Sequence, residues 1–294
     1  MPAPHSSPRP LRSSRLAGVA LAACAAAIAL FASPARAADP VQQLRLYALD
    51  CGRIEFKDLA AFSDTGEYDG RSGSIVVACF LIRHPKGTLL WDTGLGDKLA
   101  GAPPPAGNPA MRMSVGVTLA QQLTQLGLKP ADVTYVAFSH FHGDHTGNAN
   151  AFTASKWIIN KSELDWALSK PPFAVDLSTF SAYKSAKTQM IDGDYDVFGD
   201  GSVRILKMPG HTPGHQALML KLKKAGTVLL SGDLYHLRED RAHRLSPVFN
   251  LDRAQTLASF DRFERIAQNT KARVIIQHDP QDFASLPKFP AYLE

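Results

Sequence analysis

Residues 139–148 read Ser139-His140-Phe141-His142-Gly143-Asp144-His145-Thr146-Gly147-Asn148. They follow the apolar run 133–138, which is typical of a buried strand, so the stretch begins where a strand ends. His140 and His142 are two residues apart in extended chain and therefore point to the same side. The glycine that follows lets the backbone turn sharply, so that Asp144 and His145 can reach a neighbouring position. Imidazole and carboxylate groups at this spacing are typical ligands of Zn²⁺ or a similar divalent ion.

Three further strand-like runs end in the same residue types. They lead to the segments Gly210-His211-Thr212-Pro213-Gly214-His215, Ser231-Gly232-Asp233 and Gln277-His278-Asp279. Rigid scaffolds place chemistry in loops at strand ends. Four such endings therefore predict one metal site that is assembled from distant parts of the chain.

The apolar pattern predicts a mixed fold. Strand-like runs occupy residues 43–49, 75–83, 88–91, 133–138, 156–160, 203–208, 217–221, 227–230 and 273–276. Helical periodicity occupies residues 118–126, 161–168 and 252–268. Surface loops are expected at residues 63–73, 103–105 and 171–172. Because strands and helices do not alternate strictly, the pattern favours an α/β fold of the mixed α+β type, with sheets covered by helices.

The order His-x-His-x-Asp-His, Gly-His-Thr-Pro-Gly-His, Ser-Gly-Asp and a late His resembles the metallo-β-lactamase superfamily. Trp91-Asp92-Thr93-Gly94 resembles the first signature motif of that superfamily. Within it, the chain is most similar to the N-acyl homoserine lactonases, through residues 46–52, 140–148 and 211–216. The resemblance spans about residues 43–290. It implies a four-layer αββα sandwich that forms a single hydrolase domain, residues 38–294.

The resemblance also implies a ligand set. A first ion would be bound by His140, His142 and His211, a second by Asp144, His145 and His278, and Asp233 would bridge both. His211 is preferred over His215 because His211 lies in the turn directly after a strand. His215 lies at the entry to the next strand and is interpreted as structural. Asp92 is expected to orient ligands by hydrogen bonds, and a plain turn residue is the alternative.

The implied cofactor is a pair of divalent metal ions, with zinc as the first choice and iron, manganese or cobalt as alternatives. A metal-bridging hydroxide would attack the substrate carbonyl, and Asp144 would move the proton to the leaving alkoxide. The lactonases carry a Tyr three residues after the bridging Asp. Here that position is His236, and Tyr235 lies one residue early. Either side chain is a candidate electrophilic helper, and lining of the pocket wall is the alternative.

The predicted function is hydrolysis of the lactone ring of N-acyl homoserine lactones. The bridging Asp233 disfavours the zinc β-lactamases, which lack a bridging carboxylate at this position. The alternatives are a promiscuous aryl esterase or organophosphate triesterase, a lactonase for another ring, and a non-catalytic binding module. The binding module is disfavoured because every ligand position is filled. An apolar acyl pocket could use Met111, Met113, Trp166, Phe173, Phe180 and Phe249.

The N-terminal segment is typical of a secretory signal peptide. Residues 1–15 hold three arginines and no acid, residues 16–32 are apolar, and a small-x-small cleavage site ends at Ala37. We therefore expect a signal peptide at residues 1–37 and a periplasmic or secreted mature protein. A retained membrane anchor and a lipoprotein modified at Cys24 are the alternatives.

Charge and cysteine content restrict the partners. Four of the 32 basic residues and none of the 27 acidic ones lie in residues 1–37, which leaves 28 against 27, a net charge of +1. That balance does not favour nucleic acid as a partner. The expected partners are a small lactone or ester and a second copy of the chain in a homodimer, with residues 63–73 as the contact loop. No membrane association is expected after signal cleavage. Cys51 and Cys79 are either a disulfide, as an oxidising compartment permits, or two buried thiols.

Overall fold

A computed structural model describes residues 43–102, 110–169 and 172–294, and these residues all belong to one compact unit. The predicted signal peptide, residues 1–37, the predicted loop at residues 103–105 and the first residue of the predicted loop at residues 171–172 lie outside the described residues. Within the described residues, no helix is long and apolar enough to cross a membrane.

The larger sheet has seven strands within the described residues, in the order β4-β1-β2-β3-β5-β6-β7. They are β1 (Arg45–Phe56), β2 (Gly73–His84), β3 (Gly87–Trp91), β4 (Met111–Ser114), β5 (Tyr135–Ala137), β6 (Lys156–Asn160) and β7 (Lys187–Ile191). Pairing is antiparallel from β4 to β3 and parallel from β3 to β7. The parallel half aligns the carboxyl ends of β3, β5 and β6 at one edge.

The smaller sheet has five strands in the described part of the chain, in the order β12-β11-β10-β9-β8. They are β8 (Tyr195–Asp196), β9 (Val203–Lys207), β10 (Gln216–Leu222), β11 (Gly226–Leu230) and β12 (Arg273–Ile275). Only the β11–β12 pairing is parallel among them. Because this pair is parallel, the segments that follow Leu230 and Ile275 begin side by side.

The helices have sequence signals at their ends. They are α1 (Leu119–Gln125), α2 (Gly143–Thr146), α3 (Lys161–Ser169), α4 (Arg238–His243), α5 (Arg253–Thr270) and α6 (Pro280–Ala284). Thr118 caps α1 by accepting a hydrogen bond from the backbone N–H of Gln121. Asp252 caps α5 in the same way through Gln255, and Lys271 ends it in the left-handed conformation.

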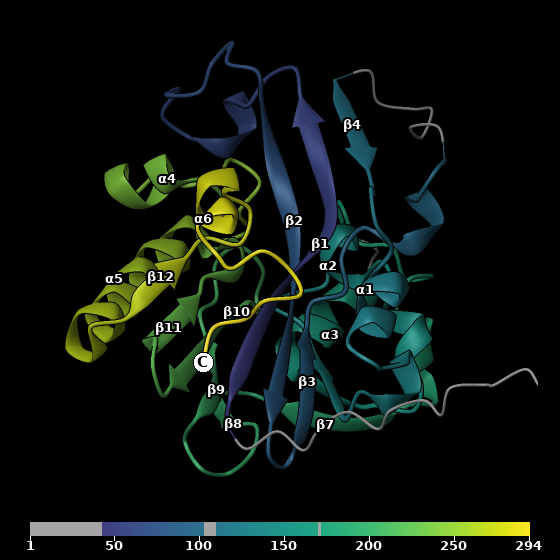
Figure 1. The fold of residues 1–294 in the computed structure, drawn as a ribbon. Helices are drawn as coiled ribbons and strands as arrows, with labels where there is room; N and C mark the ends of the chain where they lie inside the picture. The colour runs from purple at the N-terminus through teal and green to yellow at the C-terminus, as the bar shows by residue number, and fades with distance from the viewer. Residues whose placement is uncertain (1–42, 103–109, 170–171) are drawn as a thin grey trace, which may run out of the picture. The chain divides into compact units, whose positions relative to one another are not determined.

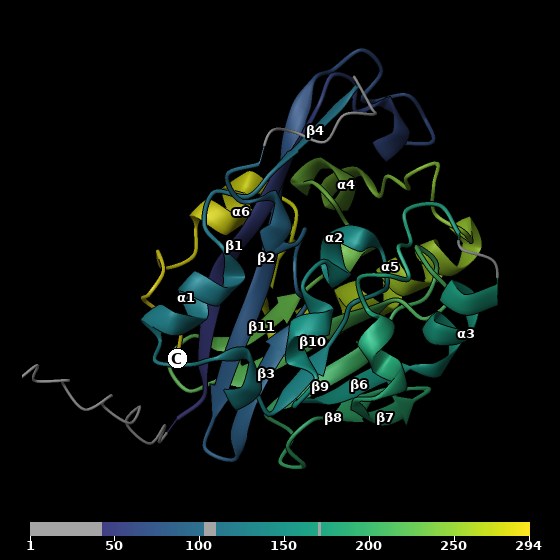
Figure 2. The same cartoon turned by 90° about the vertical axis from the view of Figure 1, so that its right-hand side faces the viewer.

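The packing shows four layers. On β2, residues 77, 79 and 81 belong to the apolar cluster that contains Leu123 of α1 and Leu164 of α3. Residues 78, 80 and 82 belong to the cluster between the two sheets. On the far face of the smaller sheet, Met219 packs with Phe260 of α5. Figures 1 and 2 show this order of α5, smaller sheet, larger sheet, and α1 with α3. The predicted mixed αββα sandwich is therefore confirmed.

Each predicted strand and helix overlaps an observed one, but β4, β7, β8, α2, α4 and α6 were not expected. The strands β4, β7 and β8 lie at the edges of their sheets. Edge strands bury less side-chain surface, so polar residues are tolerated and the apolar pattern that marks a strand is weak. The loop expected at residues 63–73 is also more than a surface segment, since the ring of Tyr68 within it is fully buried.

Cys51 on β1 and Cys79 on β2 form a disulfide, with their Cα atoms 5.8 Å apart. Both residues are buried in the core of the larger sheet. Of the two alternatives for these cysteines, the structure therefore shows the disulfide.

Candidate metal centre

All seven predicted ligands lie together, at the ends of β5, β9, β11 and β12. The ligand atoms of His140, His142, His211 and Asp233 all lie within 4.8 Å of one another. Those of Asp144, His145 and His278 form a second group, whose ligand atoms also lie within 4.8 Å of one another. We call His140, His142 and His211 the first set, and Asp144, His145 and His278 the second set.

Asp233 lies between the two sets. Its Oδ1 is 3.2 Å from Nε2 of His145 and 3.0 Å from Nε2 of His278. Its Oδ2 is 3.6 Å from Nε2 of His140 and 3.5 Å from Nε2 of His211. One carboxylate oxygen thus faces each set, which is the arrangement expected of a bridging ligand.

Four of the imidazoles turn Nε2 toward the cluster because Nδ1 is engaged elsewhere. The Nδ1 partners are Ser139 Oγ for His140 at 3.0 Å, Asp92 Oδ2 for His145 at 3.0 Å, Asn250 Oδ1 for His211 at 2.8 Å and the Val76 carbonyl for His278 at 2.7 Å. Such partners fix the tautomer and orient the ring of a metal-binding histidine. His142 differs, since its Nδ1 is the atom near the first set.

The donor set fits divalent cations. Nδ1 of His145 and Nδ1 of His278 each have a partner outside the cluster, and the Nε2 atoms of the two rings face each other across 3.2 Å. His140 and His211 present Nε2 atoms 3.1 Å apart. Lone pairs at this distance repel unless a cation lies among them. Oδ1 of Asp233 is buried and, among the described residues, has no hydrogen-bond donor. The cluster therefore indicates binding of two metal ions.

Burial sets the protonation states. It lowers the pKa of His142 to about 4 and holds those of His140 and His211 well below their usual value. These rings are therefore neutral at pH 7, with a lone pair available. Burial alone would raise the pKa of Asp233, but the surrounding histidines, His278 foremost, hold it well below its usual range. The carboxylate is thus ionised.

His215 has both ring nitrogens occupied. Its Nδ1 donates to the carbonyl of Met208 at 2.8 Å, and its Nε2 accepts from the backbone N–H of Asp233 at 2.8 Å. His215 therefore holds Asp233 in place, in agreement with its interpretation as structural.

Asp92 connects the ligand loops. Its Oδ1 accepts from the backbone N–H of Ser139 at 2.7 Å, and its Oδ2 lies within 3.0 Å of Ser139 Oγ, His145 Nδ1 and Gln277 Nε2. The Gln277 amide oxygen in turn accepts from Gly232 N and from the indole of Trp91. Asp92 has a left-handed φ of 59°, which Asp tolerates better than most residues. These contacts agree with the expected orienting role.

Tyr235 and His236 point in different directions. The Tyr235 hydroxyl donates to Glu264 at 3.1 Å, and the ring stacks on Phe260 under α5. Successive side chains of an extended segment point to opposite sides, and that of Tyr235 points into the core. Its contacts therefore give no support to a catalytic role. Nε2 of His236 lies 3.1 Å from Oδ2 of Asp233, so His236 borders the cluster.

Aromatic rings surround the cluster. Phe249 lies 5.9 Å from the ring of His211, and Trp166 lies 6.0 Å from that of His142. Of the other residues proposed for an acyl pocket, Phe180 is fully buried against Phe141, and Phe173 is 85% exposed. Met111 and Met113 lie on β4 at the edge of the larger sheet.

Sequence reasoning missed several residues that support the site. Ser139 and Gln277 each precede a predicted ligand, so their positions were a usable signal. Phe62, whose ring lies 5.1 Å from that of His236, and Asn250 come from distant loops. No spacing rule links such loops to the histidines.

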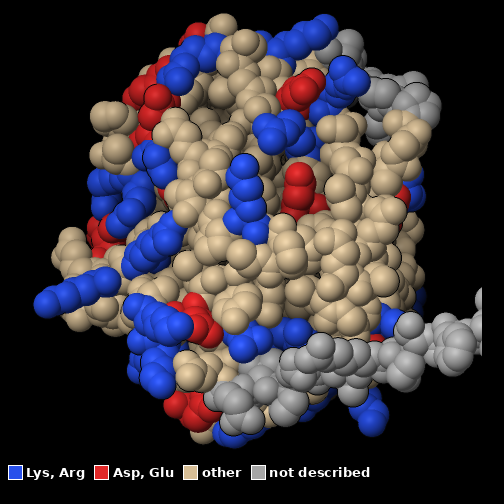
Figure 3. Space-filling model, in the orientation of Figure 1, with Lys and Arg blue, Asp and Glu red and all other residues tan. Residues whose placement is uncertain are grey.

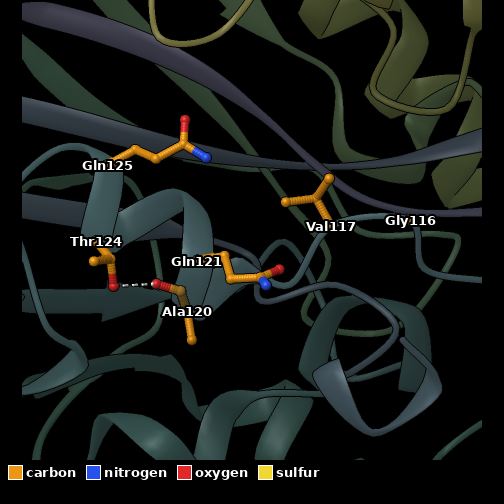
Figure 4. A pocket seen from close by; sticks show the side chains of 6 residues that line it. All are labelled: Gly116, Val117, Ala120, Gln121, Thr124 and Gln125. Carbon is orange, nitrogen blue, oxygen red and sulfur yellow. Dashed lines mark hydrogen bonds between the residues drawn. The ribbon is translucent and has the colours of Figure 1, made fainter. Parts of the chain in front are cut away.

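The described surface also carries a pocket beside α1. This pocket, of about 620 Å³, is lined by Gly116, Val117, Ala120, Gln121, Thr124 and Gln125. Figure 4 shows these residues on and beside α1. None of these side chains is charged, and the Thr124 hydroxyl donates to the carbonyl of Ala120. On the face in Figure 3, acidic side chains lie among more numerous basic ones.

Residues 73–278 match the family model of the metallo-beta-lactamase superfamily, and this range contains all seven clustered residues. The chain belongs to this superfamily. It is 31% identical to the N-acyl homoserine lactonase AttM of Azorhizobium caulinodans over 266 residues, which cover 85% of this chain and 99% of that protein. It is 28% identical to the N-acyl homoserine lactonase AiiA of Bacillus thuringiensis subsp. kurstaki, over 85% of this chain and 98% of that protein.

Solved structures agree with the sequence relatives. The 1.4 Å structure of an N-acyl homoserine lactone hydrolase, with N-hexanoyl-L-homoserine at its catalytic metal centre, superposes with a TM-score of 0.76 at 25% identity. The match covers 86% of this chain and 100% of that one. This superfamily member is therefore a metal-dependent hydrolase of the lactonase type.

Proposed function

We propose that this chain opens the ring of N-acyl homoserine lactones at a dinuclear metal centre. The observation that carries the proposal is the placement of Asp233, which offers one oxygen to each set of ligands. The similarity to AttM and AiiA, which covers 85% of this chain and nearly all of each relative, supports the choice of substrate. The aromatic rings around the cluster suit an uncharged substrate with an apolar chain.

His140, His142 and His211 would hold one ion, Asp144, His145 and His278 the other, and Asp233 both. When bound, two divalent ions supply Lewis acidity for a carbonyl oxygen and lower the pKa of a water molecule. Zinc suits this mixture of imidazole and carboxylate ligands, and iron, manganese or cobalt are the alternatives.

Asp144 is suited to proton transfer. Its side chain is 19% exposed, whereas that of Asp233 is 4% exposed, so Asp144 is the clustered carboxylate that a substrate can reach. Its Oδ2 lies 3.6 Å from Nε2 of both His145 and His278. In this role, Asp144 accepts a proton from the attacking water and returns it to the alkoxide that leaves the ring.

His236 occupies the position where a helper is expected. One face of its ring is stacked parallel to His278, at 5.6 Å between centroids, and Phe62 and Phe249 border its edges. Its Nε2 lies 3.1 Å from Oδ2 of Asp233, so in this role it holds the bridging carboxylate in place.

The decisive experiment compares substrates. We expect kcat/KM for N-acyl homoserine lactones to exceed that for simple lactones, aryl esters and paraoxon-like triesters. Chelation should abolish the activity, and added Zn²⁺ should restore it. Equal or better turnover of an aryl ester or triester would favour the promiscuous esterase, and absence of lactone turnover would refute the proposal.

Asp233→Asn tests the bridging carboxylate with nearly unchanged shape. The amide has a single acceptor oxygen, so one ligand set loses its shared ligand. We expect bound metal to fall from two ions to about one per chain, and hydrolysis to fall at least about 100-fold. Asp261→Asn is the matched control, because this acid lies on α5 in an exposed ion pair with Arg244. Two retained ions in Asp233→Asn would contradict bridging.

We also propose that the protein is exported, with residues 1–37 removed as a signal peptide. The Cys51–Cys79 disulfide supports this proposal, because structural disulfides persist in oxidising compartments. Mass spectrometry of protein from the periplasm or medium should find an N-terminus at Ala38. An intact N-terminus on cytosolic protein would contradict export.

A further inference from the structure

Glu163 is a buried carboxylate with no part in the proposed chemistry. It lies in the first turn of α3, directly after β6, and is 2% exposed. Within the described residues, no Lys or Arg forms an ion pair with it. Burial raises its pKa to about 7, which shows the cost of placing this group in the core. A buried acid without a cation needs strong hydrogen bonds to be retained.

Each oxygen of Glu163 accepts one backbone hydrogen bond from a ligand loop. Oε1 accepts from the N–H of Phe141 at 2.9 Å, and Oε2 accepts from the N–H of Gly214 at 2.9 Å. Phe141 is the residue between His140 and His142. Gly214 lies in the turn that begins at His211. One carboxylate therefore joins the two loops that carry the whole first set.

The second loop is packed closely against α3. A Cβ added to Gly214 would lie 2.5 Å from both Cβ and the backbone N of Glu163. That separation leaves no room for a side chain, so the absence of Cβ allows the loop to reach the carboxylate. The backbone N–H of Glu163 is itself directed at Oδ1 of Asn160, at 3.3 Å. The carboxylate thus has a fixed position relative to β6.

We propose that Glu163 is a positioning residue that holds His140, His142 and His211 at the spacing of the first metal site. It does so through the backbone of Phe141 and Gly214, and it touches no clustered side chain. The second set has other supports, namely Asp92 for His145 and the Val76 carbonyl for His278. Loss of Glu163 should therefore affect one site and spare the other. This inference rests on the proposed metal centre, but not on the identity of the substrate.

Glu163→Gln is the direct test. The amide keeps the shape but has one acceptor oxygen, so its NH₂ group must face one of the two backbone N–H donors. Each metal site is measured separately, by Co²⁺ titration of metal-free protein in two backgrounds. His278→Ala removes a ligand of the second site, so tight binding then reports on the first site. His142→Ala removes a ligand of the first site, so tight binding then reports on the second. Binding is read from the visible absorption of Co²⁺ and by chelator competition.

We expect Glu163→Gln to weaken Co²⁺ binding about 10- to 100-fold in the His278→Ala background and less than about 3-fold in the His142→Ala background. Asp165→Asn is the matched control on the same helix, since Asp165 is an exposed partner of Lys161, and it should change neither affinity. Equal weakening of both sites, or weakening of neither, would overturn the proposal. A purely structural defect would lower both affinities together.

Hydrogen exchange in the unmutated chain gives a second test that needs no variant to fold. If Glu163 holds the loops, the amides of Phe141 and Gly214 exchange slowly even in metal-free protein. If they exchange quickly without metal and slow down only when Co²⁺ is added, the ions order the loops and the inference is wrong. Failure of the wild-type chain to hydrolyse any lactone would refute the proposed function and leave both results for Glu163 intact.

Discussion

Removal of the Cys51–Cys79 disulfide should destabilise the protein by an amount that follows from its loop. The two cysteines are 28 residues apart in the sequence and join β1 to β2. A cross-link restricts the unfolded chain, and the entropy model for a loop of this length gives about 3.6 kcal/mol at 25 °C. For a chain of this size, that corresponds to a fall in Tm of about 10 °C.

The assay is urea unfolding of wild type and of Cys51→Ala/Cys79→Ala, each with and without reductant. The double variant should unfold at a lower urea concentration than oxidised wild type, with a steeper denaturant dependence because its unfolded chain is more open. Both sulfurs are buried, so reductant should act on wild type only as the chain unfolds. Reductant should leave the double variant unchanged, which is the internal control.

The location of the disulfide also predicts an effect on metal binding. A Cβ added to Gly94 would lie 2.3 Å from Cβ of Cys51, so the turn that follows Asp92 packs directly on the disulfide. We expect the folded double variant to bind metal more weakly as well. The reasoning would be refuted if oxidised wild type, with its disulfide verified by mass spectrometry, unfolded at the same urea concentration as the double variant.

Three further predictions concern single side chains. Tyr235→Phe should leave kcat/KM within about 2-fold of wild type and lower the free energy of unfolding by about 1 kcal/mol, because it removes only the hydrogen bond to Glu264; a 100-fold loss of activity would contradict this placement. Asn250→Ala should weaken metal binding about 10-fold or more, measured by chelator competition, since it frees Nδ1 of His211; unchanged affinity would show that this contact does not orient the ring. Because burial raises the pKa of Glu163 from 4.5 to about 7, metal-free wild type should lose up to about 3 kcal/mol of unfolding free energy relative to Glu163→Gln as the pH rises from about 4.5 to about 7. Urea titrations at pH 5 and pH 8 measure that difference, and a constant difference would contradict the shift.

The ligands could be predicted because each follows a strongly apolar strand. Burial between two layers makes β5 and β11 largely apolar, and in β9 it selects Val203, Ile205 and Leu206, so the ends of these strands are visible in the sequence. A histidine or aspartate at such an end is then conspicuous. The same argument separated His211, in the turn that follows β9, from His215, which directly precedes β10.

The supports of the ligands could not be predicted in this way. Asn250 and Phe62 reach the cluster from loops whose course depends on tertiary packing, and periodicity says nothing about such a course. Glu163 looks like an ordinary acid in the first turn of a helix, a position that acids favour on the surface. The roles of Tyr235 and His236 depended on which of the two side chains faces the cluster and which faces the core. A shift of one residue along the chain exchanges the two directions.

The parallel pairing of β12 with β11 has a consequence for the order of assembly. His278 enters the cluster only when residues 273–275 have joined the edge of the smaller sheet. A chain that ended before Arg273 would contain every residue of the first set and Asp233, but its second set would lack a ligand. We therefore expect the two sites to form in order as the chain folds, with the first able to bind its ion before β12 has joined the sheet and the second only afterwards.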